Sequence, residues 1–481
     1  MQRSSFAWRA ALAVLLTVGF YAMAAAVVTV CWGGAWMIVT ESRHIPVKLV
    51  AILAMVGGIV LWSVLPRPDH FEPPGPLLDA GQNPALFHTL SEVARKTGQP
   101  MPEEVYLVGE VNAFVAHRGG IMGIGSRPVM GLGLPLLQAL SIPEMCAVIA
   151  HEFGHYVGGD TRLGPWVYRT RAAIVRSVQN LAQAGSMMAY PFLWYMKMFL
   201  RVSHAVSRHQ EFAADAVSAR VTSAEDAGRA LRKVHAIAPA YDSYWRTEVV
   251  PLLVEGHRPP VADGFGRFLR EAPIARLVGD ALREVPEANS DPYDTHPPLS
   301  QRLDALGQRD VAPDGPEGPR AVSLLGGVAE AEAALVGSLL KPGIVVKPLA
   351  WEQVGPTLYP RLWKKALEEA PAIADVTPLG VSRLLADCDV FARKTANRPL
   401  DTESALRMTK YYAGGVIGRA LLRAGWVVES LPGRAVTLVR GDDRRSLDDL
   451  LKAAADAATW RVHLLGLGSA EADLERPNRD A

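Results

Sequence analysis

Residues 141 to 160 read SIPEMCAVIAHEFGHYVGGD and contain the pattern His-Glu-x-x-His. Ser141, followed three residues later by Glu144, forms a capping-box pattern, which predicts that a helix begins at this point. On such a helix His151 and His155 lie one turn apart on the same face. At that spacing two imidazoles can bind a single zinc ion.

Glu152 is rotated by one residue from the first histidine, so it cannot easily share that ligand direction. It can instead reach a water molecule activated by the metal and take its proton as attack on a carbonyl begins. The alternative is a pair of core histidines, since His-Glu-x-x-His also arises by chance in chains of this length. The predicted helix cap and a candidate third ligand downstream argue against that alternative.

The candidate third ligand lies in the stretch SRHQEFAADAVSARV, residues 207–221. Glu211 and Asp215 are four residues apart and face the same way on a helix. One acid can bind zinc while the other accepts the free N–H of a ligand histidine and fixes the orientation of its ring. Spacing alone does not separate this arrangement from a solvated helix face. In that alternative the acids pair with Arg208 or Arg220. His209, and His204 just before the segment, are rival ligands.

Two apolar runs without charged residues precede these motifs, at about 10–39 and 49–65. Each is long enough to cross the hydrocarbon core of a bilayer, and the connection ESRHIPVK is too short to form a domain. The runs therefore predict a transmembrane helical hairpin that enters and leaves the membrane on one side. A cleaved signal peptide is the alternative for the first run, because Arg3 and Arg9 precede it and AMA resembles a cleavage site. The run continues well past that site, as a membrane span does.

The composition excludes some function classes and favours one compartment. The 50 lysine and arginine residues nearly balance the 49 acidic residues. The chain therefore has no excess of positive charge that would favour binding to nucleic acid. The three cysteines are scattered and odd in number, which fits a reducing compartment better than a disulfide framework. Basic residues flank the two runs almost equally, so the cysteines favour a cytoplasmic position for the bulk of the chain.

Proline- and glycine-rich stretches suggest where domains end. The segments 66–76 and 311–320 are typical of linkers. The β-rich segments 103–120 and 126–134 predict short strands before the zinc-binding helix. Beyond the second linker the pattern predicts mixed α and β structure, with a hairpin followed by a helix and then a disordered tail from residue 469.

Several motifs occur in the order seen in a known family. HEFGHYVGGD, SRHQEFAADAVSA and DTHPPLSQRL resemble segments of the HtpX-like and CAAX-prenyl-protease-like membrane zinc metallopeptidases. NAF at 112–114 and VMGLGLPLLQAL at 129–140 also look like that family's segment before the zinc-binding helix. The resemblance covers about residues 104–306 and the preceding hairpin.

The resemblance implies a role for each matching residue. The zinc ligands would be His151, His155 and Glu211, with Glu152 as the catalytic base and Asp215 as the acid of the Glu-x-x-x-Asp element. His296 would stabilise the tetrahedral oxyanion, and Arg302 would hold Glu211 and Asp215 in position. Asn112 would lie on an edge strand beside a substrate that binds as an added strand.

One interval departs from the family pattern, because HtpX-like proteins have a second membrane hairpin between the zinc-binding helix and the third ligand. Here that interval contains several basic residues, and its best apolar run, residues 186–200, is interrupted by Pro191 and Lys197. We expect an interfacial helix lying on the bilayer surface, with a lid or core helix over the active site as the alternative. A multi-span chamber for a prenylated substrate is not supported.

The sequence therefore predicts an α+β protein in three parts. These are a transmembrane hairpin with its linker, a zincin-like and mainly helical metallopeptidase domain with a small sheet, and a separate α+β C-terminal module with a disordered tail, at 1–75, 76–310 and 311–481. The expected localisation is a bacterial-type inner membrane with the catalytic domain in the cytoplasm.

The expected activity is that of a zinc metalloendopeptidase with one zinc ion per chain, cleaving membrane or membrane-associated proteins in protein quality control. Its partners are a protein or peptide substrate, bound as an extended strand, and the lipid bilayer, with no nucleic acid. The alternative is a non-catalytic, membrane-tethered binding protein on a peptidase scaffold. Loss of Glu152 or of a ligand would favour that alternative, and neither is lost. A structural zinc site is disfavoured, because such sites have four protein ligands and frequent thiolates.

Overall fold

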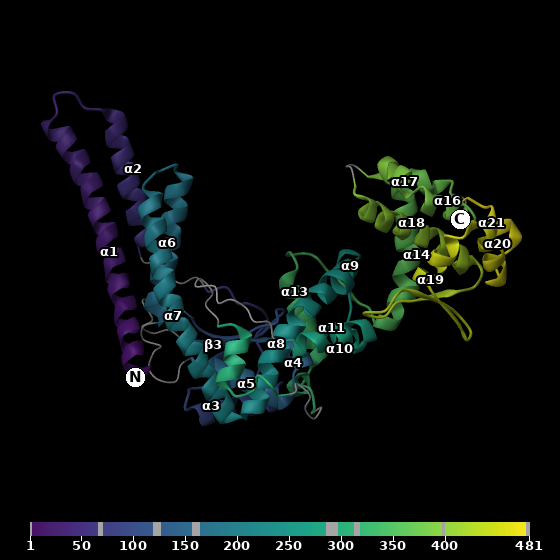
Figure 1. Ribbon diagram of the computed structural model, residues 1–481, viewed down its shortest axis with the longest axis horizontal. Coiled ribbons are helices and arrows are strands. Elements are labelled where there is room, and N and C mark those ends of the chain that lie inside the picture. The colour runs from purple at the N-terminus through teal and green to yellow at the C-terminus, as the bar shows by residue number, and fades with distance from the viewer. Residues whose placement is uncertain are drawn as a thin grey trace. The chain divides into compact units, whose positions relative to one another are not determined.

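The computed structural model describes residues 2–65, 71–118, 127–155, 164–284, 297–311, 318–396 and 400–477 (Figure 1). The chain divides into two compact units. Unit 1 comprises Met1–Ala238 and Gly279–Leu339, and unit 2 comprises Pro239–Val278 and Leu340–Ala481. The described structure is mainly helical with small sheets, which confirms the predicted α+β class at this level.

Two long helices form the N-terminal hairpin of unit 1: α1, Gln2–Glu41, and α2, Val47–Val64. Both are long and apolar enough to cross a membrane, judged by length and composition alone. Many of their large apolar side chains point outward, as expected for surfaces that do not pack against protein. The predicted apolar run 10–39 falls within α1, and the run 49–65 matches α2 except for its last residue, Leu65.

A second pair of helices packs against this hairpin: α6, Gly164–Gln183, and α7, Ala189–Val221 (Figure 1). Their shared core includes Phe20 of α1 and Phe192 of α7, whose rings meet edge to face. At the C-terminal end of α2, Arg176 Nε donates to the Ser63 carbonyl at 3.2 Å. The segment 186–200, expected as a separate interfacial helix, thus includes the first part of α7, and one of its faces is buried.

A three-stranded sheet lies beside the helix that carries the His-Glu-x-x-His motif. Its strands are β1, Glu104–Val108, β2, Ala113–Arg118, and β3, Arg127–Gly133, as the β-rich segments predicted. The order is β1-β3-β2, with β1 parallel and β2 antiparallel to the central β3. Strand β2 is therefore at the edge of the sheet.

Helices surround this sheet and continue unit 1. The motif helix α5, Ile142–Gly154, packs against α3 and α7 and also contacts β2. The remaining elements of the unit are α3 (Pro84–Thr97), α4 (Leu134–Ala139), α8 (Ala224–Tyr244, which runs on into unit 2), α11 (Ala272–Arg283, which begins in unit 2 and enters unit 1 at Gly279), α12 (Leu299–Ala305), η3 (Ala321–Leu324) and α13 (Val328–Leu339).

The second predicted linker, 311–320, is partly built into unit 1. Residues 312–317 lie outside the described residues. Directly after them, Pro319 accepts from the Ile142 N–H at 3.1 Å, and the Ala321 N–H donates to Leu140 at 2.9 Å. These bonds attach the returning chain to the start of α5.

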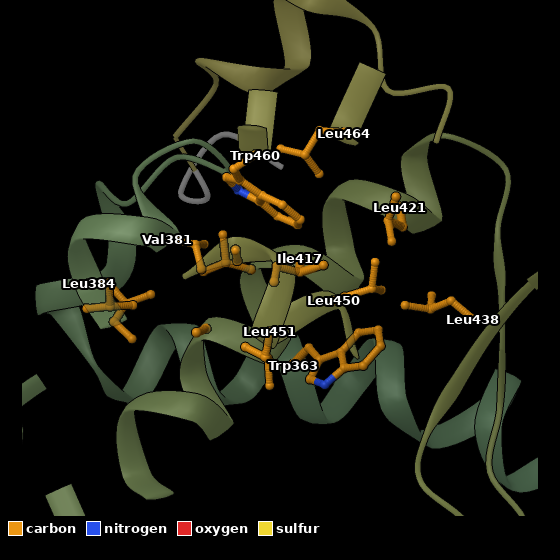
Figure 2. Close-up of a cluster of buried hydrophobic side chains, with 14 of the residues drawn as sticks. Trp363, Val381, Leu384, Ile417, Leu421, Leu438, Leu450, Leu451, Trp460 and Leu464 are labelled. Atoms are coloured by element: carbon orange, nitrogen blue, oxygen red, sulfur yellow. The ribbon is translucent and has the colours of Figure 1, made fainter. Parts of the chain in front are cut away.

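Unit 2 has its own hydrophobic core, built around α18 and α14. Figure 2 shows Trp363, Ile417, Leu450 and Trp460 converging in this core. The elements of the unit are η2 (Trp245–Val249), α9 (Val250–Val254), β4 (His257–Arg258), α10 (Val261–Arg270), β5 (Lys347–Pro348), α14 (Trp351–Glu369), α15 (Pro371–Ala374), α16 (Val381–Ala386), α17 (Cys388–Thr395), α18 (Thr402–Arg423), β6 (Val427–Glu429), β7 (Thr437–Arg440), β8 (Asp443–Ser446), α19 (Leu447–Ala454), α20 (Ala457–Gly466) and α21 (Glu471–Leu474).

The prediction of a disordered tail from residue 469 is wrong over much of its length. Residues Glu471–Leu474 form the short helix α21, and the Leu474 side chain is fully buried in the core of unit 2. The polar composition of the tail concealed this single apolar anchor. Residues 478–481 lie outside the described residues.

Candidate active site

The motif helix α5 begins with the predicted capping box. Glu144 accepts from the Ser141 N–H at 2.8 Å and is itself 2% exposed. Its carboxylate also lies 2.7 Å from Lys233 Nζ of α8. Burial raises the pKa of Glu144, but the bonds from Lys233 and Ser141 outweigh burial and hold it below its usual value. The helix N-terminus is thereby anchored to α8.

The ligand-bearing helices α5 and α7 approach each other closely because small residues meet at their crossing. A Cβ added at Gly154 would lie 2.8 Å from the Ala214 Cα, closer than real side chains pack. One turn further along α7, the Ser218 hydroxyl donates to the Ala147 carbonyl of α5 at 2.7 Å. These contacts place the acidic face of α7 against the histidines of α5.

The two motif histidines and Glu211 converge at this crossing. His151 Nε2 lies 3.5 Å from Glu211 Oε2, and His155 Nε2 lies 3.8 Å from Glu211 Oε1. Tetrahedral zinc with bonds of about 2.0–2.1 Å holds its ligand atoms about 3.3–3.5 Å apart. Two imidazoles and one carboxylate at these separations fit a zinc ion with little adjustment.

Asp215 and Arg302 support this cluster from behind. Asp215 lies 2.9 Å from His151 Nδ1 and accepts from Arg302 Nε at 2.8 Å. Burial raises the pKa of Asp215, but its bonds with Arg302 and His151 lower it below the usual value, so the carboxylate is ionised. Arg302 NH1 also lies 3.3 Å from Glu211, so one guanidinium orients both acids of α7.

The raised pKa of His151 means that zinc binding must be accompanied by release of a proton. Burial lowers the pKa of His151, but hydrogen bonding to Asp215 and Glu211 raises it to about 9. A metal ligand must be neutral, so a zinc ion has to displace a proton from this imidazole. Glu152 is near enough to act beside it, because ligand atoms of His151, Glu152 and His155 all lie within 4.8 Å of one another.

The structure describes only some of the other residues that the sequence singled out. Asn112 is exposed and directly precedes the edge strand β2, and its carbonyl accepts from the Gly133 N–H at 2.9 Å. His296 lies outside the described residues, so its predicted role is untested. His204 lies on α7, but its side chain is also outside the described part of the chain. His209, the other rival ligand, is exposed.

Gly154 and Ser218, which set the distance between α5 and α7, were not predicted from the sequence. Their role has a sequence signal. Ala214 and Ser218 are small and lie three and seven residues after Glu211, so they share its helical face. Small residues beside a predicted ligand indicate that another backbone approaches closely there.

Comparison with known proteins agrees with this geometry. The model of peptidase family M48 matches residues 80–310. Those residues belong to peptidase family M48. The match contains α5, the acidic face of α7 and Arg302, all the groups that converge at the cluster.

The chain is similar to several proteases. It is 28% identical over 246 residues to protease HtpX of Idiomarina loihiensis, covering 47% of this chain and 71% of that protein. It is 25% identical over 245 residues to protease HtpX of Escherichia coli, covering 46% and 71%. The HtpX homolog of Tropheryma whipplei is 28% identical over 162 residues, and the match spans about half of that protein, 54%. No solved structure matches the chain.

These matches confirm the resemblance to HtpX-like metallopeptidases and the assignment of the chain as a metalloprotease, a hydrolase. The family match ends at residue 310 of 481. Most of unit 2 therefore lies outside the M48 segment.

Proposed function

We propose that the protein is a membrane-anchored zinc metalloendopeptidase whose zinc ion is held by His151, His155 and Glu211. The observation that carries the proposal is the convergence of those two imidazoles and one buried carboxylate, backed by Asp215 and Arg302. Zinc in such a site supplies Lewis acidity and makes water nucleophilic at neutral pH.

Glu152 acts as the general base in this proposal. It takes a proton from the attacking water and returns it to the leaving amine, so one carboxylate serves both halves of peptide hydrolysis. It belongs to the same helical turn as the ligand histidines, and its ligand atom lies within 4.8 Å of theirs. His296 supplies a hydrogen bond to the oxyanion.

The substrate binds as an extended strand along β2. This strand is at the edge of the three-stranded sheet and contacts α5, so an added strand there would pass beside the histidines. Main-chain hydrogen bonds then give affinity with little dependence on side chains. Asn112, at the start of β2, lies beside the path of the substrate.

The hairpin α1–α2 anchors the enzyme in a bacterial-type inner membrane, with the catalytic domain in the cytoplasm. Both helices have the length and hydropathy of membrane spans. The substrates are membrane or membrane-associated proteins, including misfolded ones. Of the predicted C-terminal module, residues 318–339 belong to unit 1, and residues 340–481 belong to unit 2 and supply none of the residues assigned to the chemistry.

A pair of variants tests the chemistry. Glu152→Gln should keep about one zinc ion per chain and the fold, but lose most peptidase activity, because the base is gone and the ligands remain. Full peptidase activity in this variant would show that Glu152 is not the general base. His296→Ala should lower turnover with little loss of zinc, whereas loss of zinc would make His296 a ligand.

Accessibility labelling in intact cells tests the placement. A reporter cysteine at Arg43, in the turn between the spans, should react with an impermeant reagent. One at Glu72, an exposed residue after the hairpin, should not. The reverse pattern would place the active site outside the cytoplasm.

A further inference from the structure

Helix α12 carries Arg302 but is too short to be stable on its own. It has seven residues, Leu299–Ala305, whereas isolated helices shorter than about 12–15 residues are marginal in water. Arg302 must nevertheless stay in place, because it donates to Asp215 at 2.8 Å and lies 3.3 Å from Glu211. Contacts with the rest of unit 1 therefore have to fix the position of α12.

The chain directly after α12 packs on helix α8. Leu306 packs against a small apolar cluster that includes Ala227 and Ala230 of α8. Two residues further along, Gln308 lies against Gly228. A Cβ added at Gly228 would be 2.8 Å from the Gln308 Cβ, closer than real side chains pack. The glycine therefore lets this part of the chain approach α8 closely.

Arg232, four residues after Gly228 on α8, binds the same stretch of chain. Its Nη2 atom donates to the carbonyls of Gln308 and Arg309 at 2.9 and 2.6 Å. Its Nη1 atom donates to the Leu282 carbonyl at 3.1 Å. Leu282 is in the last turn of α11, where helix carbonyls lack a partner within the helix. One guanidinium thus ties the end of α11 and the turn after α12 to α8.

The chemistry of Arg232 is unusual for a residue that only fills space. Its side chain is buried, with the residue 4% exposed, and it forms no ion pair with an acid among the described residues. The cost of removing its charge from water is offset by three neutral carbonyls rather than by a carboxylate. Packing alone does not account for an arginine at this position. What the planar guanidinium adds is a fixed geometry between three segments of the chain.

We propose that Arg232 is a positioning residue of the metal site, which acts through α12 and Arg302. By fixing the turn after α12 it holds Arg302 against Asp215 and Glu211, and Asp215 in turn orients the ring of His151. This inference rests on the proposed zinc site. It adds to that site a residue whose hydrogen bonds go to main-chain carbonyls outside it.

The zinc affinity of the full-length protein measures the effect. Arg232→Met removes the charge and every donor but keeps an apolar stem. It should weaken zinc binding by about 10-fold, the lower end of the loss expected when a group behind a metal ligand is removed. Arg232→Lys should retain part of the affinity, because an ammonium can still donate to the carbonyls but lacks the planar fork. Affinity is measured by chelator competition, well below the unfolding temperature of each variant.

A double-mutant cycle with Arg302 separates positioning from a general loss of stability. Arg302→Gln should weaken zinc binding by about 10- to 100-fold. Adding Arg232→Met to Arg302→Gln should then weaken it by less than about twofold more, because the group that Arg232 positions is already gone. If the two losses multiply instead, Arg232 does not act through Arg302 and the proposal is wrong.

Two further variants keep the test decisive if Arg232→Met folds poorly. Gly228→Ala leaves every charge in place but displaces Gln308. It should weaken zinc binding in the parent protein and have little effect in the Arg302→Gln protein. Leu335→Ala removes a buried side chain of α13, which packs on β1, and is the control for lost stability. It should leave the zinc affinity of the folded protein unchanged.

The outcomes that contradict the proposal follow from these comparisons. Parent-like zinc affinity in both Arg232→Met and Gly228→Ala would overturn the positioning role and leave the proposed function intact. Equal weakening by Leu335→Ala would also overturn it, because the effect would then come from stability. A parent protein that binds no zinc would overturn the proposed function together with this inference.

Hydrogen exchange in the metal-free protein provides a measurement that does not depend on zinc. The amides of residues 301–308 should exchange faster in Arg232→Met than in the parent, because the turn after α12 has lost its donors. The amides of α13 should exchange at the parent rate. Unchanged exchange over residues 301–308 would show that Arg232 does not hold α12 in place.

Discussion

The Nδ1 atom of His151 lies 2.9 Å from Oδ1 of Asp215, so the other ring nitrogen, Nε2, faces Glu211. A buried carboxylate behind a ligand histidine fixes both the tautomer and the ring orientation. Asp215 is itself held by Arg302, from a helix nearly ninety residues further along the chain. The ring is thus oriented before any metal ion binds.

Asp215→Asn should weaken zinc binding by about 10- to 100-fold, the usual cost of losing such a partner. An amide cannot form the paired charge-assisted bonds with Arg302 that hold the acid in place. Zinc affinity is measured by competition with a chromogenic chelator. Asp242→Asn, an exposed acid in a surface ion pair, should leave affinity unchanged. Equal zinc affinities in the two variants would show that Asp215 does not support the metal site.

Glu211→Ala should lose most of the bound zinc, because two imidazoles alone hold the ion weakly. His209→Ala changes an exposed residue of the same helix and should retain about one zinc per chain. His204→Ala should retain it as well. Metal content is measured by atomic emission on purified protein. Loss of zinc from the His204 variant with retention in the Glu211 variant would exchange their assigned roles.

Gly154→Ala should damage the site without changing any polar group. The new methyl group would meet the backbone of Ala214, so α5 and α7 must separate. We expect a loss of about 1–3 kcal/mol in the free energy of unfolding, typical of overpacking, together with weaker zinc binding. Ala214→Gly in the same chain should restore part of both.

The control for this substitution is Gly337→Ala, in helix α13. A Cβ there meets no atom within 4 Å, so the change should be neutral or slightly stabilising. Similar losses of zinc in the two glycine variants would show that close approach of the helices is not what matters. Thermal unfolding of the full chain measures the loss of stability, and titration with a chelator measures the loss of zinc affinity.

Glu144→Gln should loosen the start of α5 in a pH-dependent way. The folded pKa of Glu144 lies below its ordinary value of 4.5, so its contribution is fully present above that pH. It is lost as pH falls through the folded pKa, because the protonated acid no longer attracts Lys233. We expect a cost of about 2 kcal/mol at pH 7, typical of charge-assisted hydrogen bonds.

Hydrogen exchange of the amides of α5 measures this effect locally. The difference between Glu144→Gln and the parent should be constant from pH 8 to pH 5 and shrink below about 4.5. Glu92→Gln, which breaks an exposed pair with Arg95, should have little effect, as is usual for surface ion pairs. A difference at Glu144 that persists unchanged at pH 3.5 would contradict the assignment.

Local sequence signals predicted the start of the motif helix and the residues that share a helix face at the candidate site. The capping box fixed the start of α5, and the four-residue spacings placed His151 beside His155 and Glu211 beside Asp215 on their helices. Periodicity reports which residues share a face. It does not report which faces meet, so spacing alone could not choose between a ligand pair and a solvated acidic face.

Long-range packing was the part that the sequence did not reveal. The bonds from Arg176 and Asn180 to Ser63 join segments more than 110 residues apart and carry no local signature. Basic residues in this interval argued against a second membrane hairpin and did not reveal that α6 packs against the first one, where Arg176 donates to the Ser63 carbonyl. The interleaving of residues 239–278 with the C-terminal segment in unit 2 is equally invisible to periodicity.

The bonds between residues 319–321 and the start of α5 bear on how the catalytic part can be produced alone. The M48 match ends at residue 310, but unit 1 continues to Leu339. A chain that ends at residue 310 would lack the Pro319 carbonyl that accepts from the Ile142 amide. It would also lack the fully buried Ala321, so the apolar surface around Ala321 would be exposed to solvent. A cut at residue 339 keeps these bonds but separates residues 239–278 from the rest of unit 2, including the pairing of His257 with Lys347, so the catalytic part is best produced within the full chain.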